Sequence, residues 1–225
     1  MIINDLELWW ERTDNGIDVL NVIFNLMESF SRKILFIVNC NVHAYNFINM
    51  IQPIENNFVG VIKCEPFSAE ELKSIIMPRH ESTRLIVKIN SKGEQSFNKW
   101  REVKMFNKIF EYSDGVIGPA LYSWISNILK YGEGAIHISY LEIPHQRILD
   151  NLSSIQKIIL LQFILHNKLS INSIPTITRL DSELIDEELI PLVNYSLIDK
   201  HGEILEISPF LLPFIVREFK RKGLL

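Results

Sequence analysis

The sequence predicts a mixed α/β segment followed by a predominantly helical chain. Residues 1–65 alternate short apolar runs with helical patterns in the order strand, helix, strand, helix, strand. That alternation, with short connections, is typical of a parallel sheet covered by helices. From Pro66 onward helical patterns dominate, and the chain closes with three helices, a strand–turn–strand pattern and a last helix. We therefore expect three units, over 1–65, 66–150 and 151–225.

Apolar periodicity predicts each element of the first unit. Residues 1–5 form a short apolar run, and 33–39 form a nearly continuous one, as in a strand buried on both faces. Apolar residues three and four positions apart predict a helix over 17–30, and a second helix is expected over 42–51. The run 57–62 predicts the third strand.

A capping box marks the start of the second unit. Ser68 followed by Glu71 predicts a helix that runs to about Met77 and ends at Pro78. The other elements expected in this unit are a strand at 84–90 with its turn at 91–94, helices near 96–112 and 118–130, and a turn at 132–134 before an apolar stretch at 135–143.

The third unit has the order of a winged helix. Helices are expected over 153–166, 170–179 and 182–195, followed by two strands within 197–207 that turn at Gly202. A last helix over 209–221 closes the chain. Three helices followed by a β-hairpin are typical of a winged helix. This fold often binds DNA through the second helix of its helix–turn–helix motif.

Composition excludes several classes of protein. The 225 residues are 47% hydrophobic and 22% charged, which excludes a wholly disordered chain. A net charge of -4 gives no global attraction to nucleic acid or anionic lipid. The longest strongly apolar run, 155–165, is about half of the ~20 residues that a membrane span needs. No secretory signal is visible, and Cys40 and Cys64 form no ligand pattern, so we expect a cytoplasmic protein without a metal.

The order of these parts resembles the second half of a P-loop ATPase of the AAA+ or related signal-transduction type. The run 1–7 resembles the acidic (Walker B) strand, and 36–41 resembles the sensor-1 strand. Residues 65–72 with 78–80 resemble the opening of the helical lid, and 118–121 the start of the later lid helix that carries sensor 2. The resemblance implies an α/β remnant of a P-loop ATPase core, then a helical lid and a C-terminal winged helix, predominantly α overall.

The resemblance also implies catalytic roles on the acidic strand. Such a strand presents carboxylates to Mg²⁺ and to the attacking water. In one register Asn4 takes the metal-side position and Asp5 the catalytic one, and in the other Asp5 and Glu7 take them. The alternative interpretation is that Asp5 and Glu7 are strand-end acids in a turn.

Further candidates face the nucleotide in this family. Asn41 would be the sensor residue that contacts the γ-phosphate, or else the cap of the helix that begins at Val42. Arg79 would reach the nucleotide from the lid, or else stabilise the end of its own helix. Gly118 and Pro119 would begin the sensor-2 helix.

The sequence departs from the family at the positions that hold phosphate. No Gly-x-x-x-x-Gly-Lys-Ser/Thr motif occurs in the chain, and no Arg or Lys lies within 34–62 or 115–127. We therefore expect a degenerate or partial ATPase that acts as a regulatory or protein-interaction module and does not hydrolyse ATP alone. ATP and Mg²⁺ are expected only if a phosphate-binding loop is supplied from elsewhere, in which case a separate P-loop chain would complete the enzyme.

The charge of the predicted winged helix and the edge of the predicted sheet indicate which partners to expect. The helix over 182–195 carries acids and no Lys or Arg, which disfavours nucleic acid. The acids are Glu183, Asp186, Glu187 and Glu188. The competing class is nevertheless a winged-helix transcription regulator. A sheet that begins at the acidic strand has an open apolar edge, so we expect self-association or pairing with a protein partner.

Overall fold

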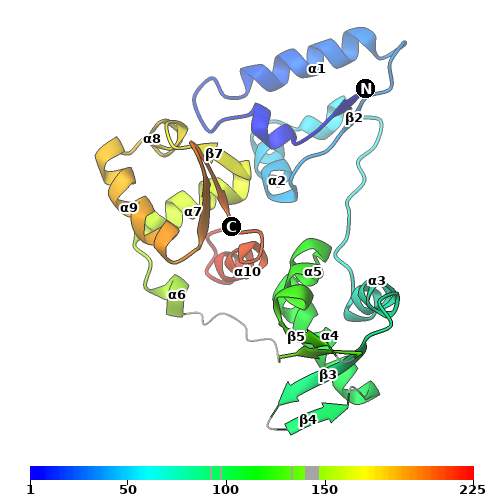
Figure 1. The fold of residues 1–225 in the computed structure, drawn as a ribbon. Helices are drawn as coiled ribbons and strands as arrows, with labels where there is room; N and C mark the ends of the chain where they lie inside the picture. Colours follow the sequence, from blue (N-terminus) through cyan, green and yellow to red (C-terminus); the bar gives the residue numbers. More distant parts are fainter. Residues whose placement is uncertain (92, 97, 133, 140–146) are drawn as a thin grey trace. The chain divides into compact units, whose positions relative to one another are not determined.

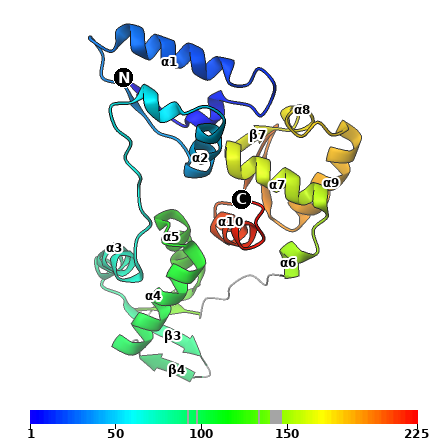
Figure 2. The same ribbon diagram turned by 180° about the vertical axis from the view of Figure 1, so that it is seen from behind.

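The computed structural model describes residues 1–91, 93–96, 98–132, 134–139 and 147–225. The chain divides into two compact units, drawn in Figures 1 and 2. Unit 1 comprises Met1–Lys63, Leu152–Ser208 and Leu224–Leu225, and unit 2 comprises Cys64–Asn151 and Pro209–Gly223. The predicted class, a mixed α/β chain that is mostly helical, is confirmed.

The first part of unit 1 is a parallel strand pair joined by a helix. Strands β1 (Ile2–Ile3) and β2 (Ile37–Val38) pair in parallel, and helix α1 (Asp18–Phe30) connects them. Helix α2 (Val42–Ile51) follows, over the range expected from the sequence. Both helices contribute to a core that also includes the 3₁₀ turn η1 (Leu6–Trp9), and one face of the strand pair packs against it.

The predicted third strand over 57–62 is wrong. Residues Ile54–Asn57 form the 3₁₀ helix η2, and 58–62 have no regular structure. Val59 and Ile62 are almost wholly exposed. A strand is stable only when a neighbour completes its hydrogen bonds, and within the described part of the chain no strand pairs with these residues.

The second part of unit 1 combines three helices with a three-stranded antiparallel sheet. The helices are α7 (Ser154–His166), α8 (Ser173–Thr178) and α9 (Ser182–Asn194). The sheet has the order β7-β9-β8, with β7 Lys168–Ser170, β8 Ile198–His201 and β9 Ile204–Ile207. The helix expected over 170–179 is shorter than predicted, because its first residue, Ser170, pairs with Ile204 as a strand.

Unit 2 is built from helices on a mixed four-stranded sheet. Its helices are α3 (Ala69–Glu81), α4 (Lys99–Ser113), α5 (Ile117–Ser126), the short α6 (Arg147–Asp150) and α10 (Leu212–Arg221). Its sheet has the order β4-β3-β6-β5, with β3 Ile86–Ser91, β4 Gly93–Ser96, β5 Ile128–Gly132 and β6 Ala135–Ile138. Only the β3–β6 pair is parallel.

Two helix ends in unit 2 differ from the prediction. Helix α3 begins at the expected Ser68–Glu71 capping box but continues through Pro78 to Glu81. Proline has no backbone N–H to donate, but its carbonyl can still accept a hydrogen bond. In α3 the carbonyl of Pro78 accepts from the backbone N–H of Ser82 at 3.1 Å. Helix α5 stops at Ser126, because the next residues pair with β6 as strand β5. The predicted turn at 132–134 includes residue 133, which lies outside the described residues.

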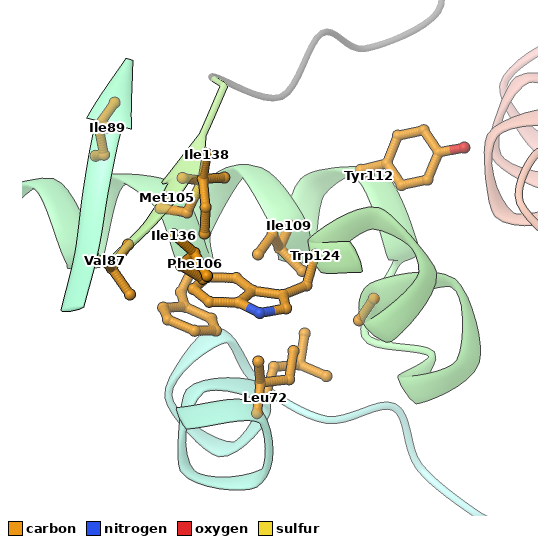
Figure 3. Packing of buried hydrophobic residues seen from close by; sticks show 12 residues of the cluster. Leu72, Val87, Ile89, Met105, Phe106, Ile109, Tyr112, Trp124, Ile136 and Ile138 are labelled. Carbon is orange, nitrogen blue, oxygen red and sulfur yellow. The ribbon is translucent and has the colours of Figure 1, made fainter. Parts of the chain in front are cut away.

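The core of unit 2 lies between the sheet and the helices. Figure 3 shows side chains of β3 and β6 gathered around Phe106 and Trp124, whose rings stack with centroids 5.6 Å apart. Helix α10 also belongs to this unit, since the hydroxyl of Tyr112 donates to the carbonyl of Phe210 and Lys222 pairs with Asp150 at 2.5 Å. Among the helices that the structure describes, none is both long enough and apolar enough to cross a membrane.

Two glycines of unit 2 offer a matched stability test. Gly115 has φ +77°, and a Cβ there would lie 2.4 Å from the carbonyl oxygen of Phe67, whereas a Cβ on Gly118 meets nothing within 4 Å. We expect Gly115→Ala to lower the free energy of unfolding by about 2 kcal/mol or more. Gly118→Ala should leave it unchanged or raise it by up to about 1 kcal/mol, since alanine favours the helix. Urea unfolding followed by tryptophan fluorescence measures both, and equal effects of the two substitutions would contradict the close approach at Gly115.

Candidate functional site at the carboxyl ends of β1 and β2

The carboxyl ends of the two parallel strands meet, and polar side chains follow both. Asn4 and Asp5 come after β1, and Asn39 comes after β2. The side chain of Asn39 bridges the two ends: its Nδ2 donates to Asn4 Oδ1 at 2.9 Å, and its Oδ1 accepts from the backbone N–H of Asp5 at 2.5 Å. The backbone carbonyl of Asn39 accepts from Leu6 N–H at 3.0 Å. One asparagine therefore fixes the turn that follows β1.

Asp5 is the exposed acid of this edge. Its backbone is left-handed, with φ 52° and ψ 60°, a conformation that aspartate tolerates better than most residues. The hydrogen bond from its N–H to Asn39 helps to offset that cost. Among the residues that the structure describes, none bonds the Asp5 carboxylate, which is exposed. The carboxylate is thus free to bind a cation.

Glu7 and Asn41 have structural partners instead. Glu7 is 3% exposed, and its Oε2 accepts from the backbone N–H of Asn41 at 3.0 Å. Asn41 caps α2 by accepting from His43 N–H at 2.8 Å, and its Nδ2 donates to the carbonyl of Ile164 at 2.9 Å. The cap expected as the alternative for Asn41 is therefore present. Asn4 and Asp5, not Glu7, form the exposed part of the acidic strand end.

Cys40 lies between Asn39 and Asn41 in the sequence, and its thiol is not a nucleophile at neutral pH. Burial raises the pKa of its thiol to about 12, and the neighbouring charge of Glu7 adds to the effect. A thiolate is the reactive form of cysteine. Cys40 therefore stays protonated and acts as a small packing residue.

Helix α7 packs its last turn against the turn that follows β1. His166 is 1% exposed and stacks on Trp10 with ring centroids 4.6 Å apart. Burial lowers the pKa of His166 to about 4, so the ring is neutral at pH 7. Leu165 joins Leu6 and Trp10 in the core. The ring of Trp10 also lies 5.5 Å from that of Phe47 on α2, whereas Trp9 is exposed.

The remaining candidates lie in unit 2. Arg79 is exposed in the last turn of α3, and its Nη1 donates to the carbonyl of Ile75 at 3.2 Å, as expected of a cation at a helix end. Gly118 is exposed and Pro119 buried in the first turn of α5. The structure thus groups Asn4 and Asp5 at one edge and assigns Arg79, Gly118 and Pro119 to the other unit.

Sequence reasoning missed two residues of this region. Asn39 lies within the run that resembles the sensor-1 strand, but the resemblance indicates Asn41 as the polar end of that strand. The parallel register would have identified Asn39, because Ile3 pairs with Val38, so Asn4 and Asn39 follow at the same level. His166 carries no local signal, because its contact with Trp10 joins residues far apart in the sequence.

Comparisons with known proteins add little to this geometry. No protein-family model matches the sequence, and a search of curated proteins finds no match. Among solved structures, the chain is similar to the RuvB Holliday junction branch migration motor of Thermotoga maritima, with a TM-score of 0.37 and 12% identity over 99% of this chain and 68% of that one. An alanine-to-serine mutant of RuvB from the same organism gives a TM-score of 0.37 and 12% identity, over 99% of this chain and 69% of the mutant's.

The buried His166 predicts an acid-dependent loss of stability. Its pKa is 6.5 in a free side chain and about 4 in the folded chain, so the unfolded state binds the proton more tightly. Above pH 6.5 this difference leaves the free energy of unfolding unchanged. As the pH falls from 6.5 to about 4, the free energy of unfolding decreases by about 3 kcal/mol in total. His166→Phe keeps a ring against Trp10 and removes the titration. Its unfolding free energy should therefore fall less between pH 7 and pH 4.5 than that of the wild type, and parallel curves would exclude this role.

Proposed function

We propose that the edge formed by Asn4, Asp5 and Asn39 is the metal-facing half of a nucleoside triphosphate site of the AAA+ P-loop type. The observation that carries the proposal is the Asn39 bridge, which joins the ends of two parallel strands and leaves the Asp5 carboxylate exposed. In open α/β sheets ligands bind outside the carboxyl ends of the strands. The β1-α1-β2 unit has such an edge.

The residues at this edge fit magnesium but not phosphate. Mg²⁺ prefers oxygen ligands and binds through one or two carboxylates together with phosphates and waters. The Asp5 carboxylate and nearby amide oxygens supply that chemistry. No group of three His, Cys, Asp or Glu side chains that could hold a metal alone occurs within the described ranges. The cradle and lysine that hold phosphates are missing from these 225 residues, so phosphate contacts come from another chain or segment.

The chain alone therefore acts as a regulatory or protein-interaction module and does not hydrolyse ATP. Residues 152–208 serve as a winged helix for protein contacts, and the helices of unit 2 serve as the lid. What supports a regulatory role is the link from the edge to α7: Asn41 joins Glu7 to the carbonyl of Ile164. A ligand that shifts the turn at Asp5 would act on this link and so on the helix that begins the winged helix.

Binding of Mn²⁺ without ATP tests the metal-facing half-site, because ATP would itself bind the metal ion. Asp5→Asn should weaken that binding by about fivefold or more, because it removes the one exposed carboxylate of the edge. Glu28→Gln is the matched control, since Glu28 is an exposed acid elsewhere in the same unit, and it should have no effect. Loss of the free Mn²⁺ electron paramagnetic resonance signal measures both.

The same proteins, now supplied with ATP and Mg²⁺, test the absence of turnover. Phosphate release by the wild-type chain should equal that of Asp5→Asn. Equal Mn²⁺ binding by Asp5→Asn and the wild type would refute the half-site, and turnover by the chain alone would refute its dependence on an outside phosphate loop.

The competing class, a winged-helix DNA-binding regulator, is disfavoured by α9. The exposed side chains of its first half include Glu183, Asp186 and Glu187, which repel phosphate. We expect no saturable binding to duplex DNA at low salt by fluorescence anisotropy. Replacing these three acids by lysine should raise DNA affinity by about tenfold or more, with a salt dependence that the wild type lacks. Steep, salt-dependent binding by the wild type would instead favour the regulator.

A further inference from the structure

Helix α1 is apolar on two faces, although its unit buries only one of them. Leu20, Phe24 and Met27 lie in the core. A second set of apolar side chains is exposed: Val19 at 48%, Val22 at 66%, Leu26 at 45% and Phe30 at 46%. We call these four residues the α1 stripe. They are three or four positions apart, so they lie along one face of the helix.

The α1 stripe is a continuous surface and not a set of scattered residues. It runs the length of a 13-residue helix, which is about 20 Å. Both ribbon views show α1 at the edge of its own unit (Figures 1 and 2). A helix that packs on one face normally carries polar side chains on the rest of its surface, and α1 confines them to Asp18, Asn21, Asn25, Glu28 and Ser29.

Opposite charges lie at the two ends of the stripe. Asp18 is the first residue of α1, and Arg32 and Lys33 follow its last residue; all three are exposed. In the parts of the chain that the structure describes, none of the three forms an ion pair with another residue. Their charges are therefore available to a partner.

An antiparallel second copy of α1 matches both the charges and the stripe. In that arrangement Val22 of one copy lies opposite Leu26 of the other, and Val19 lies opposite Phe30. The same register brings Asp18 beside Arg32 of the second copy at both ends. The two helix dipoles then oppose each other, which is favourable. A surface that matches itself in this way is the requirement for a two-fold symmetric interface.

We propose that the chain self-associates through an antiparallel pair of α1 helices, with the α1 stripes in contact and Asp18 paired with Arg32 and Lys33 across the axis. Four apolar side chains from each copy bury less than the about 800 Å² per partner of a standard interface. The dimer is therefore in equilibrium with the monomer and depends on concentration. The inference is independent of the nucleotide site.

A matched pair of substitutions tests the apolar part. Leu26 and Asn25 are adjacent and exposed on α1, but only Leu26 lies in the stripe. By sedimentation velocity at increasing concentrations, Leu26→Lys should raise the dimer dissociation constant tenfold or more, and Asn25→Lys should change it little. A wild type that stays monomeric throughout, or equal weakening by both variants, would overturn the proposal.

A mixing experiment tests the antiparallel register. One variant carries Asp18→Lys, and the other carries Arg32→Glu with Lys33→Glu. Each should be monomeric alone, because like charges meet at both ends of its homodimer. Mixed together, they should form a heterodimer at wild-type affinity, because each end then pairs opposite charges. Failure to associate on mixing would exclude this register, and thermal unfolding of each variant close to that of the wild type is the control for folding.

Discussion

The contact between the last turn of α7 and the turn after β1 holds unit 1 together. Leu165 lies in the same buried cluster as Leu6 and Trp10, and His166 stacks on the Trp10 ring. Burying a large apolar side chain contributes about 1.5–3 kcal/mol. The β1–β2 pair, in contrast, has only two residues in each strand. So short a ladder is not stable by itself, and the cover that α7 supplies is what fixes the strand ends in place.

That contact also determines which polar groups remain available for chemistry. Asn41 uses its backbone N–H for Glu7 and its side chain for the α2 cap and the carbonyl of Ile164. Glu7 is consequently enclosed, and burial, with a further contribution from the Glu7 charge, raises the pKa of the Cys40 thiol to about 12. Only the turn at Asn4 and Asp5 stays outside this network, held from one side by Asn39. At this strand end Glu7 and Asn41 therefore stabilise the fold, whereas Asn4 and Asp5 remain exposed.

Local signals made the helices predictable. The expected Ser68–Glu71 capping box is present, and α2 spans the expected residues, because caps and periodicity act over a few neighbours. Strands depend on distant partners. The run 57–62 has strand composition but no neighbour within the described chain, whereas 128–130, predicted as the end of a helix, belong to β5 beside β6. For the same reason Asn4 and Asp5 could be proposed from the sequence, whereas Asn39 required the strand register and His166 required the packing of α7.

The β1–β2 pair is apolar on both faces but buries only one of them within the described residues. Ile3 and Val38 face the core, but their neighbours Ile2 and Ile37 remain 65% and 55% exposed on the other face of the strand pair. A parallel sheet is ordinarily buried on both faces, with further strands at its edges. An added strand beside β2 would bring its own carboxyl end, and hence new backbone N–H groups, to the level of Asn39 and Asp5. Backbone N–H groups at such edges can bind phosphate, so under the proposed function a strand that completes the sheet beside β2 would also supply the phosphate contacts.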